Sequence, residues 1–324
     1  MPAGKKTDDK YKRSQERLLK VRSGAAEMEI WLKDLLRAGL LQLPQKNADW
    51  FDHMRARMVD AQAPGLGNLV RNLKELSLQK EADWQSEAAH IIAKIFLLLE
   101  GIKKLERMDP KTEADVRYLS GWNVNQQEIL DYPFNTNIFD HWLSVAVLTE
   151  MVEGLNVERN YLYGLKSGAF ALHMNFAFRR KPEPSGLAAG KVFAADLTYV
   201  PSNLPLRTVI RKLGEEKSYS SEPMMLLPDF TALLAHMTLH RSKYPWVEEH
   251  PFAVAAVCPI KQGSHFLLKD REEKTMAIAT EFDMKRCLNL LACTGGKPFN
   301  LFVLFSKGKI IPLGIIGQRR YVML

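Results

Sequence analysis

Cysteine is scarce in this chain of 324 residues. Only Cys258, Cys287 and Cys293 occur, and so small and odd a number argues against a framework of disulfide bonds. Cys287 and Cys293 lie too far apart in the sequence for the tight cysteine pairs of zinc knuckles. We therefore expect buried structural thiols, no metal ion, no cofactor and a reducing compartment, the cytoplasm.

Long apolar runs are missing as well. The most apolar helical stretch, residues 91–99, is too short to cross a bilayer and contains Lys94. The N-terminus carries charge without an apolar core behind it, so no secretory signal is expected. These absences predict a cytoplasmic protein without a membrane partner.

The sequence also lacks the motifs of common enzymes. No Gly-x-Ser-x-Gly elbow occurs, and the Gly-Gly-Lys at 295–297 lacks the earlier glycine of a phosphate loop and precedes a proline. His236 and His240 have the spacing of a helical metal site, but Met237 stands where a zincin helix needs glutamate. Surface or half-buried histidines are the favoured interpretation. We predict a protein that is not an enzyme.

Basic residues gather at the N-terminus. Residues 1–24 hold eight Lys/Arg against three Asp/Glu, a net charge of +5, whereas the remaining 300 residues carry only +3. Such an arm can bind nucleic acid or another anionic surface, although a solvated lead-in to the first helix is the favoured interpretation. Its candidate nucleic-acid contacts are Lys5, Lys6, Lys10, Lys12 and Arg13.

Apolar periodicity predicts helices first and strands second. A 3.6-residue period, interrupted at Pro44, Pro64-Gly65 and Asp109-Pro110, predicts helices over 17–43, 48–62, 66–76 and 83–108. Asn125 with Glu128, and Thr112 with Asp115, are typical of helix N-caps. The first half of the chain is therefore expected to form a helical domain.

Beyond residue 137 the pattern changes. Segments rich in Val, Leu, Phe and Tyr, separated by glycine turns, predict a three-stranded antiparallel meander over 141–151, 157–164 and 169–178. Further strands are expected at 192–200, 205–211, 252–258, 264–269, 274–279, 299–305, 309–316 and 319–323, with helices at 229–241 and 283–293.

The predicted fold class is α+β, with an N-terminal helical domain followed by an antiparallel β-rich domain that contains a few helices. We place a flexible basic arm at 1–16, the helical domain at 17–135 and the β-rich domain at 137–324. The β-rich domain can consist of two subdomains, 137–225 and 226–324.

Three polar residues stand just before the break at Pro64. Arg57 and Asp60 are three apart on a predicted helix and can pair, and Gln62 follows them. Because Pro64 cannot donate a backbone hydrogen bond, we expect Arg57 and Gln62 to satisfy the helix-end carbonyls while Asp60 orients Arg57. The alternative is an exposed docking surface, which makes these three residues the candidate binding site.

Aromatic and basic residues are mixed along the predicted meander. Aromatic side chains on a sheet can stack nucleic-acid bases, although a core face is the favoured interpretation. The residues in question are Trp142, Tyr161, Tyr163, Phe170, Phe176, Phe178, Arg179 and Arg180.

The stretch 57–66, Arg-Met-Val-Asp-Ala-Gln-Ala-Pro-Gly-Leu, resembles a segment of bacterial SWIM zinc-finger proteins that lies a few dozen residues after the finger. Segments that are similar to the family follow the same order at 29–39, 161–164, 167–176, 205–207, 290–298 and 311–313. The finger's Cys-x-Cys motif does not occur in these 324 residues, so zinc binding and finger-borne DNA binding are not carried over.

The resemblance implies an accessory role, since this family is often encoded beside a MoxR-type AAA+ ATPase and von Willebrand A domain proteins. Our leading hypothesis is a non-catalytic interaction or adaptor protein that serves such an assembly. The alternative is a nucleic-acid-binding module that uses the basic arm and the aromatic-basic sheet face.

Overall fold

A computed structural model describes residues 3–79, 83–122, 124–133, 135–152, 154–178, 185–220, 223–263, 265–317 and 320–324. For residues 3–11, 79 and 152 it describes the backbone alone. The chain divides into two compact units: Met1–Asn125 with Pro201–Asn203, and Gln126–Val200 with Leu204–Leu324. Within the described ranges, none of the helices is both long and apolar enough to span a membrane.

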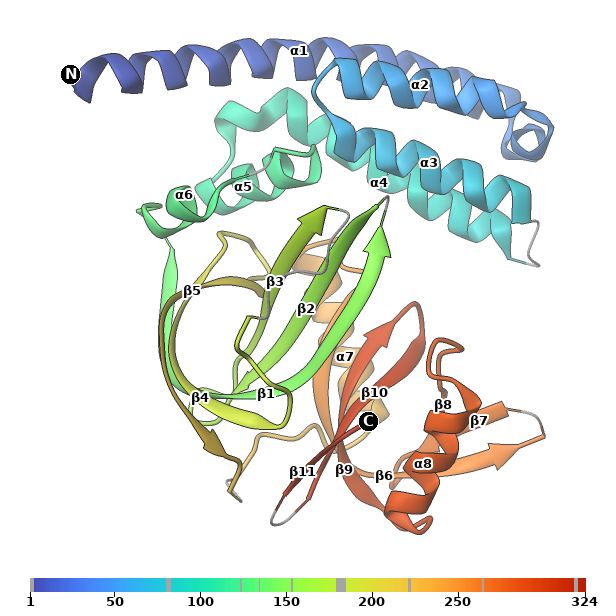
Figure 1. Cartoon of the computed structure of the whole chain (residues 1–324). Coiled ribbons are helices and arrows are strands. Elements are labelled where there is room, and N and C mark those ends of the chain that lie inside the picture. Colours follow the sequence, from blue (N-terminus) through green and yellow to red (C-terminus); the bar gives the residue numbers. More distant parts are fainter. Residues whose placement is uncertain are drawn as a thin grey trace. The chain divides into compact units, whose positions relative to one another are not determined.

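The first unit is helical (Figure 1). Its elements are α1 (Ala3–Ala38), η1 (Leu40–Gln45), α2 (Ala48–Asp60), α3 (Pro64–Gln79), α4 (Trp84–Lys104), η2 (Leu105–Arg107) and α5 (Pro110–Leu119). Each long helix buries one apolar stripe; that of α1 consists of Leu18, Val21, Ala25, Met28, Leu32 and Leu35. The helical period therefore builds the core of this unit.

Three features of this unit differ from the prediction. The first helix ends at Ala38, because Gly39 takes a left-handed conformation (φ +89°) and its N–H donates to the Leu35 carbonyl, so that Pro44 lies inside η1. Asp109, not Thr112, caps α5, and its carboxylate accepts the Thr112 N–H. The backbone of residues 3–16, expected as an arm, forms the first turns of α1.

The second unit begins with α6 (Gln126–Leu130), ahead of the expected boundary at 137, and continues into a five-stranded closed barrel. The barrel strands are β1 (Thr136–Val152), β2 (Leu155–Gly164), β3 (Phe170–Phe178), β4 (Lys191–Tyr199) and β5 (Arg207–Ser218). β1, β2 and β3 form the predicted antiparallel meander, which is confirmed.

The barrel closes in the order β1-β2-β3-β5-β4, with β4 returning antiparallel to β1. A short parallel pairing joins β3 to β5 at Leu172–Arg207 and His173–Thr208. A five-stranded Greek-key barrel with this strand order has the topology of the OB-fold. β1 is long enough to pair with both β2 and β4, and a bulge between Ser144 and Ala146 bends it.

A six-stranded sheet completes the second unit, in the order β11-β10-β9-β6-β7-β8. Its elements are α7 (Phe230–Lys243), β6 (Glu249–Gln262), β7 (His265–Lys269), β8 (Thr275–Ala277), α8 (Met284–Thr294), β9 (Phe299–Ser306), β10 (Lys309–Ile316) and β11 (Tyr321–Met323). The predicted strands and both helices are confirmed, with Asp229 capping α7 and Gly295 closing α8. Helices precede sheets along the chain, so the predicted α+β class is confirmed.

Separate apolar clusters hold the second unit together. One fills the barrel, with Trp142 donating from Nε1 to the Ala195 carbonyl at 3.1 Å. Another joins the barrel to the six-stranded sheet, where Tyr161 and Tyr163 pack with Phe302. The third lies under α7 and α8; its members include Phe230, Leu233, Met237, Cys287 and Leu290. The barrel and the six-stranded sheet are thus joined by a common apolar cluster.

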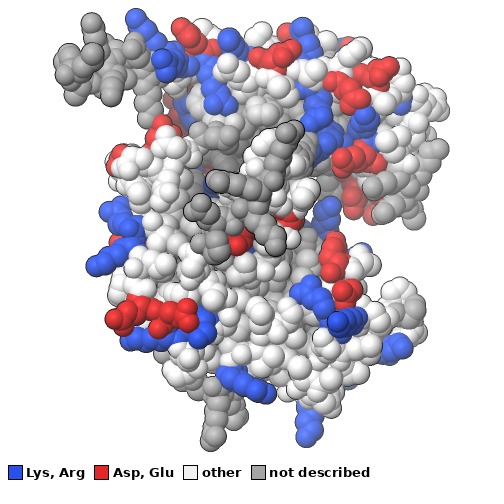
Figure 2. All heavy atoms as spheres, in the orientation of Figure 1, with Lys and Arg blue, Asp and Glu red and all other residues white. Residues whose placement is uncertain are grey.

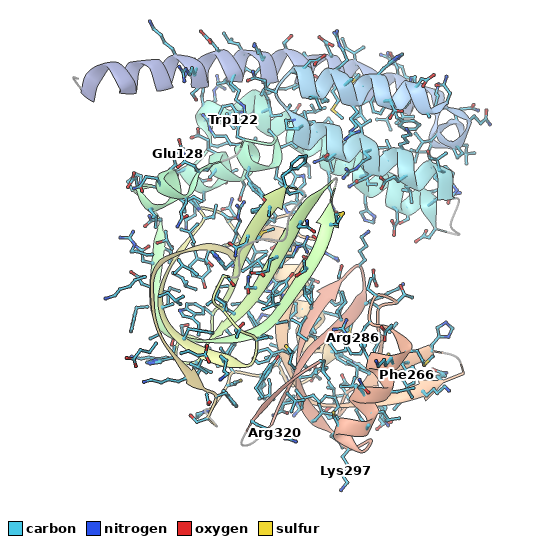
Figure 3. The ribbon with its side chains drawn as sticks, viewed as in Figure 1. Trp122, Glu128, Phe266, Arg286, Lys297 and Arg320 are labelled. Atoms are coloured by element: carbon cyan, nitrogen blue, oxygen red, sulfur yellow. The ribbon has the colours of Figure 1, made fainter. Side chains whose placement is uncertain are left out.

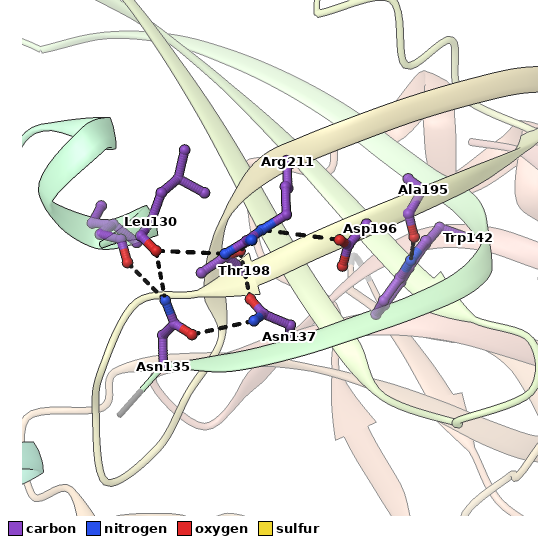
Figure 4. A network of polar contacts seen from close by, with 9 residues as sticks. Leu130, Asn135, Asn137, Trp142, Ala195, Asp196, Thr198 and Arg211 are labelled. Atoms are coloured by element: carbon purple, nitrogen blue, oxygen red, sulfur yellow. Dashed lines mark hydrogen bonds and ion pairs between the residues drawn. The ribbon is translucent and has the colours of Figure 1, made fainter. Parts of the chain in front are cut away.

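A polar network fastens α6 to one end of the barrel (Figure 4). Arg211 on β5 donates to the Leu130 carbonyl at 3.5 Å and to Thr198 Oγ1 at 3.4 Å. Thr198 in turn donates to Asn137 Oδ1 at 2.7 Å, while Asn135 Nδ2 donates to the Leu130 carbonyl at 3.1 Å. The network joins α6 to strands β1, β4 and β5.

Candidate functional site

The side chains of Arg57, Asp60 and Gln62 do not form the predicted network at the end of α2. The Ala63 N–H donates to the Met58 carbonyl at 2.8 Å, and the Gln62 N–H donates to the Val59 carbonyl at 2.9 Å. These two bonds, with Gln62 at φ +60°, form a Schellman motif. Backbone groups rather than side chains therefore satisfy the end of α2.

Arg57 and Asp60 do not pair as expected. Arg57 instead donates from Nε to Glu27 on α1 at 2.8 Å and makes a second bond to the same carboxylate oxygen from Nη2. Both of these side chains are exposed, and so is Asp60. An exposed pair of this kind contributes little to stability, about 0–1 kcal/mol. Arg57, Asp60 and Gln62 thus keep an accessible surface, and a binding role for them stays a prediction.

The residues that follow Gln62 must be small, because they lie at a close contact with the end of α5. Ala63 is fully buried, and a Cβ added to Gly65 would lie 1.8 Å from the Leu119 carbonyl oxygen. The Gly65 N–H also donates to the Ser120 carbonyl at 3.2 Å. Gly121 has φ +97°, and a Cβ there would lie 2.6 Å from Pro64 Cγ. The turn between α2 and α3 therefore touches the end of α5, backbone against backbone.

Arg17 joins the same place from α1. Its Nη2 donates to the Gly121 carbonyl at 2.9 Å and to the Gln62 carbonyl at 3.3 Å. Trp122, which follows α5 (Figure 3), lies close to two guanidinium groups: Arg17 Cζ is 5.1 Å and Arg117 Cζ is 4.0 Å from its ring centroid. We call Arg17, Gln62, Arg117, Gly121 and Trp122 the α1 root.

The charge of Arg17 is held in an unusual setting. Burial, with a smaller contribution from the neighbouring Arg117, lowers the pKa of the Arg17 guanidinium. Arg117 pairs with Glu113 at 2.7 Å, whereas Arg17 donates to two backbone carbonyls. No local sequence pattern points to this role of Arg17, because its carbonyl acceptors lie 45 and 104 residues away along the chain.

The basic arm lies N-terminal to this root. Lys12 and Arg13 are exposed on α1, and Figure 2 shows basic side chains at this end of the helix. Lys5, Lys6 and Lys10 lie on the same helix, but their side chains are outside the described residues.

Most of the aromatic residues of the meander belong to the apolar core, which was the favoured interpretation. Trp142 fills the barrel, while Tyr161 and Tyr163 pack beneath the six-stranded sheet, so these three rings cannot stack on bases. OB-folds bind oligonucleotides on the face of their second and third strands, and here the second sheet covers much of that face. Phe176 and Phe178 remain 46% and 62% exposed. Arg179 and Arg180 lie outside the described residues.

The two histidines of α7, His236 and His240, lie in an aromatic cluster with His250 of β6. His240 and His250 have ring centroids 4.2 Å apart, and His236 is 6.4 Å from His240. Burial, aided by the neighbouring His240, lowers the pKa of His250 to about 3, so this ring is neutral at neutral pH. Within the described part of the chain, no group of three or more His, Cys, Asp or Glu is placed to hold a metal ion.

The thiols are only partly as expected. Cys287 is buried, and burial raises the pKa of its thiol. Cys293 is exposed and Cys258 is half-buried, which corrects the expectation of a buried Cys293. In α8, Cys287 lies on the core side, whereas Cys293 belongs to the last turn of the helix.

One known domain family matches part of the helical unit. Residues 16–119, from α1 to the end of α5, match the family model of the SWIM-associated four-helix bundle domain. The segment is similar to this domain family, and we call residues 16–119 the SWIM-associated bundle. The resemblance to the region that follows the finger in SWIM proteins is therefore confirmed for this segment. No curated protein and no solved structure gives a significant match to the chain.

Within the SWIM-associated bundle, the resemblance segment 57–66 contains the close contact between the α2–α3 turn and α5. The similar segments from residue 161 onward lie outside the matched range, so for them the resemblance stays a prediction. The α1 root belongs to the bundle, except that Gly121 and Trp122 follow its last matched residue.

Proposed function

We propose that the protein is a non-catalytic interaction protein, an adaptor that serves an assembly of a MoxR-type AAA+ ATPase and von Willebrand A domain proteins in the cytoplasm. The observation that carries this proposal is the SWIM-associated bundle at residues 16–119. The proposed partners come from the resemblance to SWIM proteins, and the proposed role needs neither a metal nor a cofactor.

The bundle offers apolar side chains for docking. Phe96 and Leu97 on α4 are 49% and 43% exposed, whereas Ile95 and Leu98 beside them are fully buried. Ile30 on α1 is also exposed. Large apolar side chains that a helix turns toward water are typical of surfaces that bind other proteins. Phe96 and Leu97 are therefore the first positions to test.

The experiment combines the purified chain with a MoxR-type ATPase and a von Willebrand A protein, encoded beside it where such genes occur, in the presence of ATP. We expect co-elution on size exclusion and a dissociation constant that titration calorimetry can measure. Replacing Phe96 and Leu97 together by serine should weaken binding by about tenfold or more. The matched control is the double serine variant of Met284 and Leu288 on α8, which are each 52% exposed.

Absence of binding to either partner at about 100 µM, a concentration that detects even weak complexes, would reject the adaptor role. If both variants weaken binding equally, the loss comes from removing apolar surface in general and not from a docking site at Phe96 and Leu97. Binding that neither variant changes would keep the adaptor role and move the docking site away from α4.

A further inference from the structure

The six-stranded sheet repeats the strand pairing of the first barrel. β6 pairs antiparallel with β7 and with β9, just as β1 pairs with β2 and with β4. β7 pairs antiparallel with β8, and β9 with β10, as β2 pairs with β3 and β4 with β5. The long first strand of each set carries a bulge, between Ser144 and Ala146 in β1 and between Val254 and Val257 in β6. These antiparallel pairings are therefore the same, strand for strand.

A parallel pair also joins β8 to β10. Ile278, directly after β8, pairs with Ile310, and the Ala279 N–H donates to the Ile310 carbonyl at 2.9 Å. In the first barrel, the short parallel pairing between β3 and β5 has the same place. The sheet thus curls into a second five-strand arrangement with the topology of the OB-fold, to which β11 is added at the edge.

The face of the second and third strands differs between the two OB-like halves. In the first barrel, Tyr161 on β2 and Leu172 on β3 pair with each other and lie in the cluster shared with the six-stranded sheet. In the second half, Phe266 and Leu268 on β7 lie in the core, so the alternate positions of this strand point outward. The outward row across β6, β7 and β8 consists of Ile260, Leu267 and Ala277.

This row, which we call the apolar row, is accessible. Ile260, Leu267 and Ala277 are each half-buried, whereas the corresponding positions of the first barrel are buried. OB-folds bind extended ligands on the face of their second and third strands. The second OB-like half therefore keeps open the face that the first barrel uses for packing.

Three exposed lysines border the apolar row. Lys307 and Lys309 belong to the turn between β9 and β10, and Lys261 belongs to the end of β6. Lys261 Nζ lies 5.9 Å from the centroid of the Phe266 ring. Positive charge beside an apolar face complements a ligand that carries both phosphates and apolar rings.

The pairing of β8 brings these lysines to one end of the apolar row. The Ile278 N–H donates to the Phe266 carbonyl at 3.2 Å, so the start of β7 lies beside the end of β8. Lys261 is paired with Phe266 across β6 and β7. Ile278 also pairs with Ile310, the residue that follows Lys309, so the start of β10 lies beside the same point.

We propose that the outward face of β6, β7 and β8 is a binding site for single-stranded nucleic acid. The bases lie on the apolar row, and Lys261, Lys307 and Lys309 contact the phosphates. A single strand fits this face because its base planes are exposed, whereas a duplex stacks them inside. The site is distinct from the basic arm and from the meander face, and it goes beyond the proposed adaptor role without depending on it.

The test measures binding of the full chain to a fluorescent oligodeoxythymidine by anisotropy, between about 50 and 200 mM salt. The test variant replaces Lys261, Lys307 and Lys309 by glutamine. The control replaces the lysines of another surface in the same way and has the same net charge. Its positions, all exposed, are Lys20, Lys212 and Lys217.

We expect the test variant to lose about tenfold or more in affinity at the lower salt concentration, while the control keeps the affinity of the parent. The slope of log K against log salt should fall by about 2, or 0.7 for each phosphate contact removed from a single strand. Leu267→Ala should weaken binding at every salt concentration and leave the slope unchanged, because it removes contact with a base but no charge. Urea denaturation of each variant checks that the loss does not come from unfolding.

Four outcomes would overturn the proposal: no binding at the lower salt, equal loss in both lysine variants, an unchanged slope in the test variant, or preference for a duplex over the single strand. Polyglutamate tests the other source of negative charge. If it binds at the same lysines and the oligonucleotide does not, the site recognises an acidic protein, and the proposal is wrong. Failure here leaves the ATPase-binding experiment unaffected, because that experiment concerns α4.

Discussion

Replacing Gly65 by alanine tests how the SWIM-associated bundle is closed. Gly65 is the second residue of α3, and an added Cβ would lie 1.8 Å from the Leu119 carbonyl oxygen and 2.9 Å from the Ser120 carbonyl carbon. Both obstacles belong to backbone that cannot rotate away. The start of α3 or the end of α5 must therefore move by more than an ångström.

The expected cost can be worked from the contacts involved. Overpacking against a rigid neighbour costs about 1–3 kcal/mol, and weakening the bond from the Gly65 N–H to the Ser120 carbonyl adds about 1 kcal/mol. Better helix propensity of alanine offsets about 1 kcal/mol. We expect the free energy of unfolding to fall by about 1–3 kcal/mol.

The assay is equilibrium denaturation with urea, and Gly67→Ala is the matched control. Gly67 lies in the same turn of α3, but a Cβ there meets nothing closer than the Arg55 carbonyl oxygen at 3.4 Å. Gly67→Ala should therefore be neutral or stabilising by up to about 1 kcal/mol. If Gly65→Ala costs less than about 0.5 kcal/mol, the size of an ordinary surface substitution, the close contact between α3 and α5 is refuted.

Three further substitutions have defined outcomes. Gln62→Gly should raise the unfolding free energy by about 0.5–1 kcal/mol, because Gln62 holds φ +60° at a position that favours glycine, and unchanged or lower stability in urea would contradict the Schellman assignment. Tyr321→Phe should lower it by about 1–3 kcal/mol, because the buried Val145 carbonyl loses a donor at 2.7 Å; a neutral result would show that another donor serves this carbonyl. His250 is neutral when folded, with a pKa of about 3, but takes up a proton below about 6.5 when unfolded, so stability should decrease by about 2 kcal/mol from pH 7 to pH 5. His250→Gln should remove most of that decrease, whereas the exposed His90→Gln should not, and identical pH profiles for all three chains would refute a buried neutral His250.

Local signals predicted much of this fold. Asp229 caps α7 three residues before the amide that it binds, and Gly295 ends α8 in the left-handed conformation, so both helices could be delimited from short patterns. Glycine turns likewise delimited β1, β2 and β3. In these cases the interaction that determines the structure lies within a few residues in the sequence.

Distant contacts could not be predicted in this way. Arg57 has an acidic neighbour at i+3, yet it pairs with Glu27, thirty residues away on another helix. Closure of the barrel depends on the two residue pairs between β3 and β5, which sequence patterns do not register. For the candidate site, the helical setting of the basic arm and the role of Arg17 needed the structure, because both follow from how α1 packs.

The cluster shared by the barrel and the six-stranded sheet has a consequence for how the second unit unfolds. Tyr161, Tyr163 and Phe302 lose their cover together if the two sheets separate, and the bond from Tyr321 to the Val145 carbonyl is lost in the same step. Arg159 on β2 would also leave Glu249 on β6, to which it donates at 2.7 Å. Separation of the two sheets would expose each sheet's half of this core to water. Gln126–Val200 and Leu204–Leu324 should therefore exchange their most protected amide hydrogens at one common rate, as a single cooperative unit.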